Sequence, residues 1–185
     1  MTGRIVILSG PPGAGKSTVA RALAQDSEAA RAVHLHTDDF FLSVRKGYID
    51  SWLPQSHAQN VTIGNAIAAS VRAYAEGGFE VFVDGVVGPW LLDPWLRLAR
   101  DDGLDVRYVV LRPDERTTLE RGTARNHPMT DVAIIGKAWM DFAALGVYET
   151  HVLDTTSQKS DETVDVLRKR LAEGLYRLGE GLARP

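Results

Sequence analysis

One eight-residue stretch near the amino terminus limits the folds open to this chain. Residues 10–17 read GPPGAGKS and match the pattern GxxxxGK[ST], in which successive backbone amides wrap around the phosphates of a nucleoside triphosphate. An apolar run at residues 4–8 precedes the motif, and a helical pattern at residues 17–25 follows it. A strand, a glycine-rich turn and a helix therefore follow one another in the order that this motif requires.

Each residue type in the motif has a chemical reason. Glycines allow backbone angles that a Cβ would forbid, so several N–H groups can point at one anion, and the helix that starts near Gly15 adds its positive end. We expect Lys16 to reach the β- and γ-phosphates and the Ser17 hydroxyl to ligate Mg²⁺. The residues expected to bind the nucleotide here are Gly10, Gly13, Ala14, Gly15, Lys16, Ser17 and Thr18.

Length and composition narrow the range of partners. A chain of 185 residues is expected to form one domain, residues 1–185, with a core of its own. The net charge of −3 and the lack of any block of Lys or Arg argue against a nucleic-acid groove or a membrane-binding patch, and favour a small-molecule acceptor. Without cysteine there are no disulfides or thiolate metal sites. We find no leader-like segment and no apolar run near ~18 residues, so we expect a cytoplasmic location.

Strand and helix patterns alternate along the chain, which is typical of an α/β fold with a parallel sheet covered by helices on both faces. The segments expected to form strands are residues 4–9, 32–36, 79–84, 106–111 and 150–153. The segments expected to form helices are residues 16–26, 56–76, 94–100, 113–125, 130–145 and 161–177.

Residues 37–55 are predicted to be irregular and are too long for an ordinary connection between a strand and a helix. They leave the end of the second strand beside the phosphate-binding loop, where ligands of open α/β sheets bind. We therefore interpret residues 37–60 as an acceptor-binding arm. Ser56 and Gln59 are spaced as a capping box at the start of the following helix.

Two neighbouring carboxylates, Asp38 and Asp39, directly follow the second strand. A phosphotransferase needs an acid near the acceptor hydroxyl. Because side chains alternate along an extended chain, only one of the two is expected to face the phosphates. We predict that Asp38 is the base and keep Asp39 as the alternative. The simpler explanation is that the pair caps a turn.

Another acid, Asp84, ends the apolar third strand. A carboxylate at this position beside the P-loop strand is suited to hold Mg²⁺ together with Ser17. Asp-Gly pairs often form only a turn, but the third strand, which leads into this pair, has the composition of a buried strand. The sequence therefore predicts a metal site made by Ser17 and Asp84.

Arginines are concentrated after the fourth strand, in a segment at residues 113–130 that we interpret as a lid. Arg121 and Arg125 are four residues apart and so share a helix face. Guanidinium groups there would clamp phosphoryl oxygens as the lid closes. Arg116 is a weaker candidate, since it can pair with Glu120.

Histidines and tryptophans give weaker indications. His34 and His36 share a strand face, but with no third ligand at metal spacing we expect them to be structural. The tryptophans near the proposed acceptor loops either line an apolar pocket or pack in the core, and these are Trp52, Trp90 and Trp95.

Over nearly its whole length the chain resembles the P-loop small-molecule kinases, most closely the branch that contains chloramphenicol phosphotransferase and uncharacterised bacterial proteins. The features that carry the resemblance, besides the P-loop, are Asp38 soon after the second strand, Asp84 ending the third, the RGTAR sequence at 121–125 and the DTT sequence at 154–156. The segment from residue 40 to residue 60 differs from that of chloramphenicol phosphotransferase, so the acceptor stays open.

The resemblance implies a three-layer αβα P-loop NTPase fold with a five-stranded parallel sheet, like that of adenylate, shikimate and gluconate kinases. It also implies that ATP is the nucleotide, that Asp38 deprotonates an acceptor hydroxyl and that Arg125 is the lid arginine. The loop at residues 154–156 would lie near adenine, with Thr155 at the nucleotide.

These features predict an ATP- and Mg²⁺-dependent transfer of the γ-phosphoryl group to a hydroxyl of an antibiotic or metabolite. A nucleoside or nucleotide kinase is the nearest alternative, although the arm offers only Arg45 and Lys46 to bind a phosphorylated acceptor. A nucleotide-dependent switch that hydrolyses ATP and transfers nothing is an alternative from another class.

Overall fold

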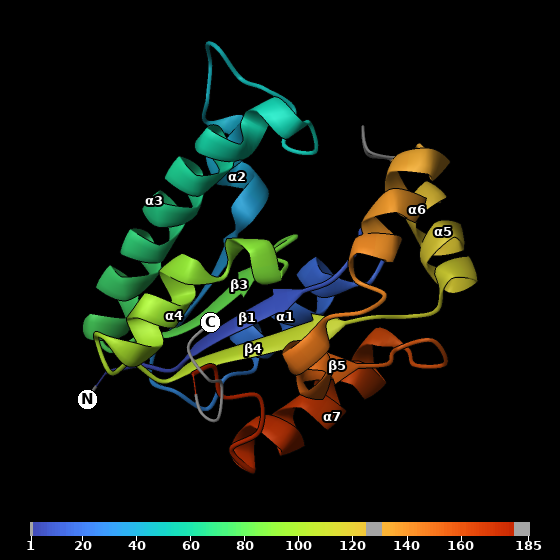
Figure 1. Ribbon diagram of the computed structural model, residues 1–185. Helices are drawn as coiled ribbons and strands as arrows, with labels where there is room; N and C mark the ends of the chain where they lie inside the picture. Colours follow the sequence, from blue (N-terminus) through green and yellow to red (C-terminus); the bar gives the residue numbers. More distant parts are fainter. Residues whose placement is uncertain (1, 125–130, 180–185) are drawn as a thin grey trace.

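A single parallel sheet forms the centre of the protein (Figure 1). The computed structural model describes residues 2–124 and 131–179. In the described chain the strands are ordered β2-β3-β1-β4-β5, and every neighbouring pair is parallel, as the sequence predicts. The strands are β1 Ile5–Ser9, β2 Ala32–His36, β3 Glu80–Asp84, β4 Val106–Leu111 and β5 Val152–Leu153.

Helices cover both faces of this sheet, so the fold has three layers (Figure 1). Residues of α1 and α7 belong to one buried cluster, and residues of α3 and α4 belong to another on the opposite face. The helices are α1 Lys16–Gln25, α2 Thr37–Leu42, α3 His57–Glu76, α4 Asp93–Arg100, α5 Glu115–Thr123, α6 Val132–Asp141 and α7 Ser160–Ala172. Short 3-10 turns are η1 Pro54–Ser56, η2 Pro89–Leu91 and η3 Gly146–His151.

The central strands are buried on both faces, which explains their continuous apolar sequence. In β1, Ile5 and Ile7 pack in the cluster with α3 and α4, whereas Val6 and Leu8 pack in the cluster with α1 and α7. This division follows from the alternation of side chains along a strand. The sheet is thereby fixed in register, and the ends of its strands become defined positions for functional groups.

The first departure from the prediction is helix α2, which occupies Thr37–Leu42 within the segment expected to be irregular. Two acids in its first turn, Asp38 and Asp39, favour a helix N-terminus. Phe40 and Phe41 pack against the core cluster. The expectation of an irregular segment over residues 37–55 was wrong at its start because the chain turns from strand to helix without a connecting loop.

Departures also occur near the carboxyl terminus. The helix expected at residues 130–145 is α6, which ends at Asp141, and the strand expected at 150–153 is limited to the two residues of β5, after a 3-10 turn. The last helix, expected to reach residue 177, ends at Ala172. Beyond it the chain turns back at Gly174, with φ +84°, and forms an antiparallel bridge between Arg177 and Arg107. These tertiary contacts are not visible in helical periodicity.

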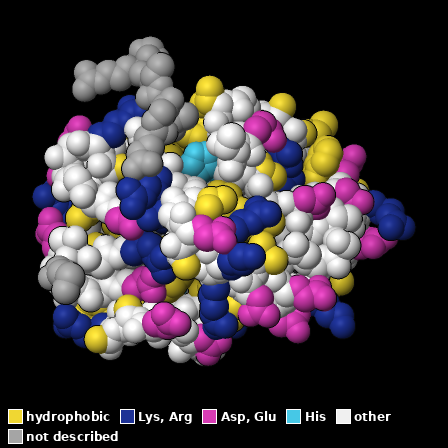
Figure 2. Space-filling view, turned by 90° about the horizontal axis from the view of Figure 1, so that it is seen from below, with side chains coloured by type: hydrophobic (Ala, Val, Ile, Leu, Met, Phe, Trp, Pro, Cys, Tyr) yellow, Lys and Arg dark blue, Asp and Glu magenta, His cyan; other side chains and the backbone are white. Residues whose placement is uncertain are grey.

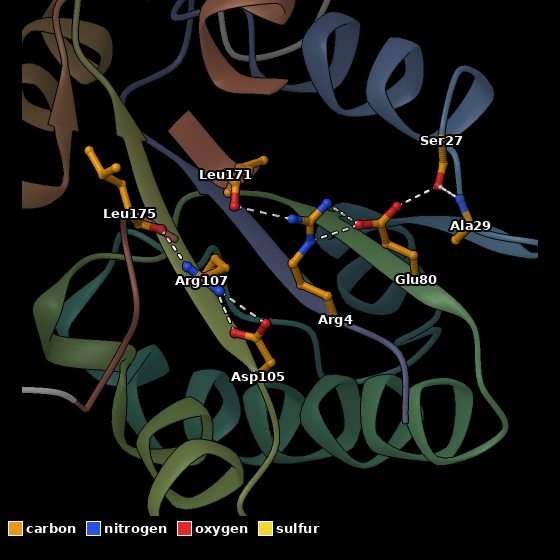
Figure 3. Close-up of polar contacts among 8 residues, drawn as sticks. All are labelled: Arg4, Ser27, Ala29, Glu80, Asp105, Arg107, Leu171 and Leu175. Carbon is orange, nitrogen blue, oxygen red and sulfur yellow. Dashed lines mark hydrogen bonds and ion pairs between the residues drawn. The ribbon is translucent and has the colours of Figure 1, made fainter. Parts of the chain in front are cut away.

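Two arginines pair with acids at the amino ends of the strands (Figure 3). Arg4, just before β1, donates from Nε to Glu80 Oε1 at 2.7 Å, and the Ser27 hydroxyl donates to the other oxygen of Glu80. Arg107 of β4 donates to both oxygens of Asp105, at 2.6 and 3.1 Å. The carboxylates of Glu80 and Asp105, at this end of the sheet, are therefore hydrogen-bonded to donors fixed by the fold.

Charged groups of both signs are mixed on one face of the molecule (Figure 2). On the face seen from below, Lys and Arg side chains alternate with Asp and Glu (Figure 2). Of the helices in residues 2–124 and 131–179, none is both long and apolar enough to span a membrane.

Candidate active site

The P-loop connects the end of β1 to the start of α1, as the motif predicts. Gly15 precedes the first residue of α1, so the first backbone amides of that helix open onto the loop. Gly13 has φ +90°, and a Cβ there would lie only 2.5 Å from the carbonyl oxygen of Thr118 in α5. The loop and α5 can therefore approach closely only because this residue is a glycine.

Lys16 is the first residue of α1 and is 7% exposed. Its Nζ donates to the carbonyl of Pro11 at 2.9 Å, which holds the ammonium group across the loop. Of the other P-loop residues, Ala14 is buried, while Thr18 is exposed in the first turn of the helix.

Asp84, fully buried at the end of β3, receives several hydrogen bonds. The Ser17 hydroxyl donates to its Oδ2 at 2.5 Å, His34 Nε2 contacts Oδ1 at 2.5 Å, and His36 Nδ1 contacts Oδ2 at 3.0 Å. Burial by itself would raise the pKa of Asp84, but the hydrogen bonds from His34, His36 and Ser17 outweigh it and lower the pKa well below its usual range. Asp84 is therefore ionised.

Asp38 lies in the first turn of α2, and its Oδ2 is 3.3 Å from His36 Nε2. The hydrogen bond from His36 lowers the pKa of Asp38, and the charge of Lys16 lowers it further. Conversely, the hydrogen bonds to Asp38 and Asp84 raise the pKa of His36 to about 10. The Asp38 side chain is still 44% exposed, so an ionised carboxylate is open to a ligand beside the P-loop lysine.

The structure separates the two neighbouring acids. Asp39 is exposed on α2, whereas Asp38 faces His36. The reason differs from the predicted one, because strand alternation does not apply to α2. Successive residues of a helix are rotated by about 100°, and this rotation sends the two side chains in different directions.

Ser17 and Asp84 bring oxygen ligands together where the sequence predicts a metal site. A hydroxyl and a carboxylate are ligands that Mg²⁺ prefers, and Mg²⁺ usually takes only one or two protein carboxylates, with phosphate oxygens and water completing its shell. The described residues include no group of three or more His, Asp or Glu side chains arranged to hold a metal ion by themselves. The residues present therefore fit Mg²⁺ bound together with nucleotide phosphates.

Arg121 of α5 is directed toward the loop after β5. Its guanidinium donates to the carbonyl oxygens of Thr155, Thr156 and Gln158, each at 3.3 Å. Thr155 is buried, and its hydroxyl has no hydrogen-bond partner in the described part of the chain. The structure thus places two predicted nucleotide-binding residues, Arg121 and Thr155, together at this loop.

The other lid arginines differ in position. Arg116 is exposed, with Glu120 3.9 Å away as its ion-pair partner. The sequence suggested this pairing as the alternative to a role in the lid. Arg125, predicted to be the lid arginine, lies outside the described residues.

The arm between α2 and α3 is held by side-chain amides. Gln59 pairs with both the N–H and the C=O of Ile49, at 2.9 and 2.7 Å, and Asn60 donates to the carbonyl of Ser51 at 2.8 Å. The predicted capping box is wrong, because Ser56 makes no cap hydrogen bond to α3 and its hydroxyl contacts backbone carbonyls of the arm. The first turn of α3 thus holds the arm in place.

Sequence reasoning missed how the two histidines connect the acids. We expected His34 and His36 to be structural. Both contact Asp84, and His36 also connects Asp84 to Asp38. The available signal was the His-x-His spacing at a strand end, next to one acid and near the strand that ends in another. Of the tryptophans, Trp95 is buried in the core, whereas Trp52 and Trp90 are exposed.

The phosphate-binding loop, the Ser17–Asp84 pair and the parallel sheet define a P-loop protein with a kinase-like fold. The chain belongs to the family described as AAA domain, whose family model matches residues 5–145. The comparison with curated proteins finds no sequence match.

Solved structures with similar folds include several kinases. A sugar kinase from Janibacter sp. HTCC2649 is 18% identical, with 92% of this chain and 95% of that one covered and a TM-score of 0.69. A gluconokinase from Sinorhizobium meliloti 1021 is 22% identical, with 95% and 96% covered and a TM-score of 0.66. The tunicamycin resistance protein of Deinococcus radiodurans is 18% identical, with 99% of both chains covered and a TM-score of 0.63. At these identities the likeness establishes the fold.

Proposed function

We propose that this protein is an ATP- and Mg²⁺-dependent phosphotransferase that moves the γ-phosphoryl group to a hydroxyl of a small molecule. The observation that carries the proposal is the connected set Asp38–His36–Asp84–Ser17 beside Lys16. It combines an accessible carboxylate, a metal-binding pair and a phosphate-binding lysine. These are the groups that phosphoryl transfer requires.

In this mechanism the P-loop amides and Lys16 bind the β- and γ-phosphates and neutralise their charge. Ser17 and Asp84 hold Mg²⁺, which supplies further charge neutralisation when bound. Asp38 accepts the proton of the acceptor hydroxyl while that oxygen forms a bond to the γ-phosphorus and the bond from the γ-phosphorus to the bridging oxygen of ADP breaks. Asp38 suits this role because it is ionised and partly exposed.

Residues of the lid and of the loop after β5 complete the nucleotide site. Arg121 fixes the loop at residues 155–158, and the buried Thr155 hydroxyl provides a polar group for the nucleotide. We propose that Arg125 joins Lys16 in clamping the phosphoryl oxygens, as the resemblance implies. An activity that depends on ATP favours a cytoplasmic location.

The acceptor is proposed to be an unphosphorylated alcohol. The cationic side chains of the arm, Arg45 and Lys46, are both exposed and are few for a phosphate-bearing acceptor. The sugar kinase and the gluconokinase with similar folds are named for small hydroxylated substrates. The small number of cations in the arm is what disfavours a nucleotide kinase. Experiment must decide whether the protein is instead a switch that only hydrolyses ATP.

The test is ADP release from MgATP across a panel of hydroxylated antibiotics, sugars, sugar acids and nucleosides, with EDTA and the Lys16→Met variant as controls. The proposal predicts that one chemical class stimulates release by at least about tenfold, and that both EDTA and the variant abolish the stimulation. If MgATP is hydrolysed at one slow rate whatever the acceptor, the protein is a switch and the proposal is wrong.

A further inference from the structure

The loop after β3 is fixed rigidly at the carboxyl edge of the sheet. The Ser9 hydroxyl, at the end of β1, donates to the carbonyl of Val87 at 2.7 Å and accepts from its N–H at 3.0 Å. The buried Tyr108 hydroxyl of β4 donates to the same carbonyl at 2.7 Å. Side chains from β1 and β4 therefore hold this loop in one position.

Trp90, in turn η2 of the same loop, is braced on two sides. A Cβ on Gly88 would lie 2.3–2.5 Å from three atoms of the indole, so the ring rests directly on glycine backbone. Phe142 contacts the ring edge-on, with centroids 5.6 Å apart and an interplanar angle of 62°. Even so, Trp90 is 52% exposed. The indole is therefore held in place while much of its apolar surface stays available to a ligand.

The loop that carries Trp90 adjoins the proposed chemistry. Gly85 follows Asp84 directly, and a Cβ at Gly85 would lie 2.0 Å from the hydroxyl oxygen of Thr37, the residue before Asp38. The start of this loop and the start of α2 are therefore in direct contact. In Figure 1 the turn lies next to the end of β3 and below α2.

The arm carries exposed apolar side chains as well as charged ones. Its large exposed apolar side chains come from the end of α2 and from the segment that Gln59 and Asn60 hold in place, and they are Leu42, Tyr48, Trp52 and Leu53. Aromatic and aliphatic side chains bind a neutral ring well, whereas for an anionic acceptor the arm offers only Arg45 and Lys46.

We propose that Trp90 forms the floor of the acceptor subsite and that the acceptor is an alcohol carrying a flat, neutral ring that stacks on the indole. This inference rests on the proposed phosphotransferase function and adds the substrate class. The ring lies on Trp90 and the hydroxyl is directed to Asp38.

The test compares 2-phenylethanol with 2-cyclohexylethanol, which is matched in size, and with glucose, in the wild-type protein and in the variants Trp90→Ala and Trp90→Phe. Stacking predicts that 2-phenylethanol has the highest kcat/KM for transfer, that Trp90→Ala lowers this value about tenfold, and that Trp90→Phe restores most of it. The KM for MgATP is expected to stay unchanged in all variants. An equal kcat/KM for 2-phenylethanol in the wild type and Trp90→Ala, or a preference for glucose, overturns the subsite while leaving the phosphotransferase function intact.

A binding measurement keeps the two proposals separate. Saturation-transfer NMR with 2-phenylethanol and MgADP is expected to show ring contact with the wild type and much weaker contact with Trp90→Ala. If this difference appears but no acceptor is phosphorylated, the subsite stands and the phosphotransferase function fails. If the two proteins give equal saturation, the subsite fails.

Discussion

At the amino ends of the strands, the Arg107 guanidinium spans both oxygens of Asp105 (Figure 3). At the carboxyl ends, two carboxylates, Asp38 and Asp84, converge on the single imidazole of His36. The first arrangement matches one cation to one anion with fork geometry. The second concentrates negative charge and leaves Asp38 partly open to solvent.

The comparison shows that an ionic cluster does not mark a site by itself. Arg107 is as deeply buried as many core residues, yet its partners are all fixed protein groups. Asp38 differs because it has accessible oxygen atoms and lies beside a phosphate-binding loop. We therefore expect substitution of the partly exposed Asp38 to change activity and substitutions at the amino end to change stability.

The largest effect is expected from Asp38→Asn. An amide keeps the size of the side chain but cannot accept the acceptor proton, so kcat for transfer should fall by about 10²–10⁴-fold. The affinity for MgATP should stay close to wild type. The unfolding temperature should fall only slightly, because Asp38 is 44% exposed and solvent screens its pairing with His36. Asp39→Asn is the matched control, since that side chain is exposed on the same helix, and it should keep its activity. Full activity in Asp38→Asn would break the contrast between the two ends.

Arg107→Met is expected to have the opposite profile. It removes the fork to Asp105 and the hydrogen bond to the Leu175 carbonyl. Because Asp105 is 40% exposed and can be rehydrated, we expect a loss of about 2–3 kcal/mol, less than for a fully buried pair. The measurement is urea unfolding, with kcat and KM determined at 15 °C.

A control for that experiment is Arg168→Ala, whose ion pair with Asp26 is exposed on both sides. Its effect on the free energy of unfolding should stay below about 1 kcal/mol. If the two substitutions destabilise the protein equally, the amino-end pair has no special structural role.

The contribution of His36 to stability should depend on pH. The pKa of His36 is raised from 6.5 to about 10 by its contacts with Asp38 and Asp84. Its stabilisation is therefore complete below pH 6.5 and is lost as the pH rises through about 10. In EDTA, the difference in unfolding free energy between the wild type and His36→Asn should shrink from pH 6 to pH 10. A difference that is constant over this range would show that His36 is not held by the two acids.

The smallest effect is expected from Arg121→Gln. Its three carbonyl contacts are long, and each hydrogen bond contributes roughly 1 kcal/mol or less. We expect the Kd for MgATP, measured by calorimetry, to rise about 3–10-fold with little change in kcat. Arg116→Gln, on the exposed side of the same helix, should leave the Kd unchanged, and equal effects of the two would remove the role of Arg121 in the nucleotide site.

The sequence predicted the sheet and the P-loop well because both depend on local patterns. Buried strands have continuous apolar runs, and the GxxxxGK[ST] spacing fixes a turn and a helix start. The pairing of Ser17 with Asp84 was also predictable, since both follow adjacent parallel strands whose ends meet at one edge.

What could not be predicted depends on contacts between distant segments. Helix α2 starts directly after β2 because Phe40 and Phe41 find a core surface that sequence periodicity does not show. His36 contacts Asp84 because the two residues are paired across β2 and β3, 48 positions apart. The side-chain amide of Gln59 holds the arm through Ile49 instead of capping α3. A single sequence does not reveal such pairings.

The most direct measurement follows the γ-phosphoryl group itself. The protein is incubated with γ-labelled ATP, Mg²⁺ and the acceptor that stimulates ADP release most, and the label is traced in the wild type and in Asp38→Asn. We expect the label to appear on the hydroxyl of the acceptor in the wild type and to be almost absent from the acceptor in the variant. Label found only in inorganic phosphate, at the same rate in both proteins, would contradict the assignment of the carboxyl end as a phosphotransferase site.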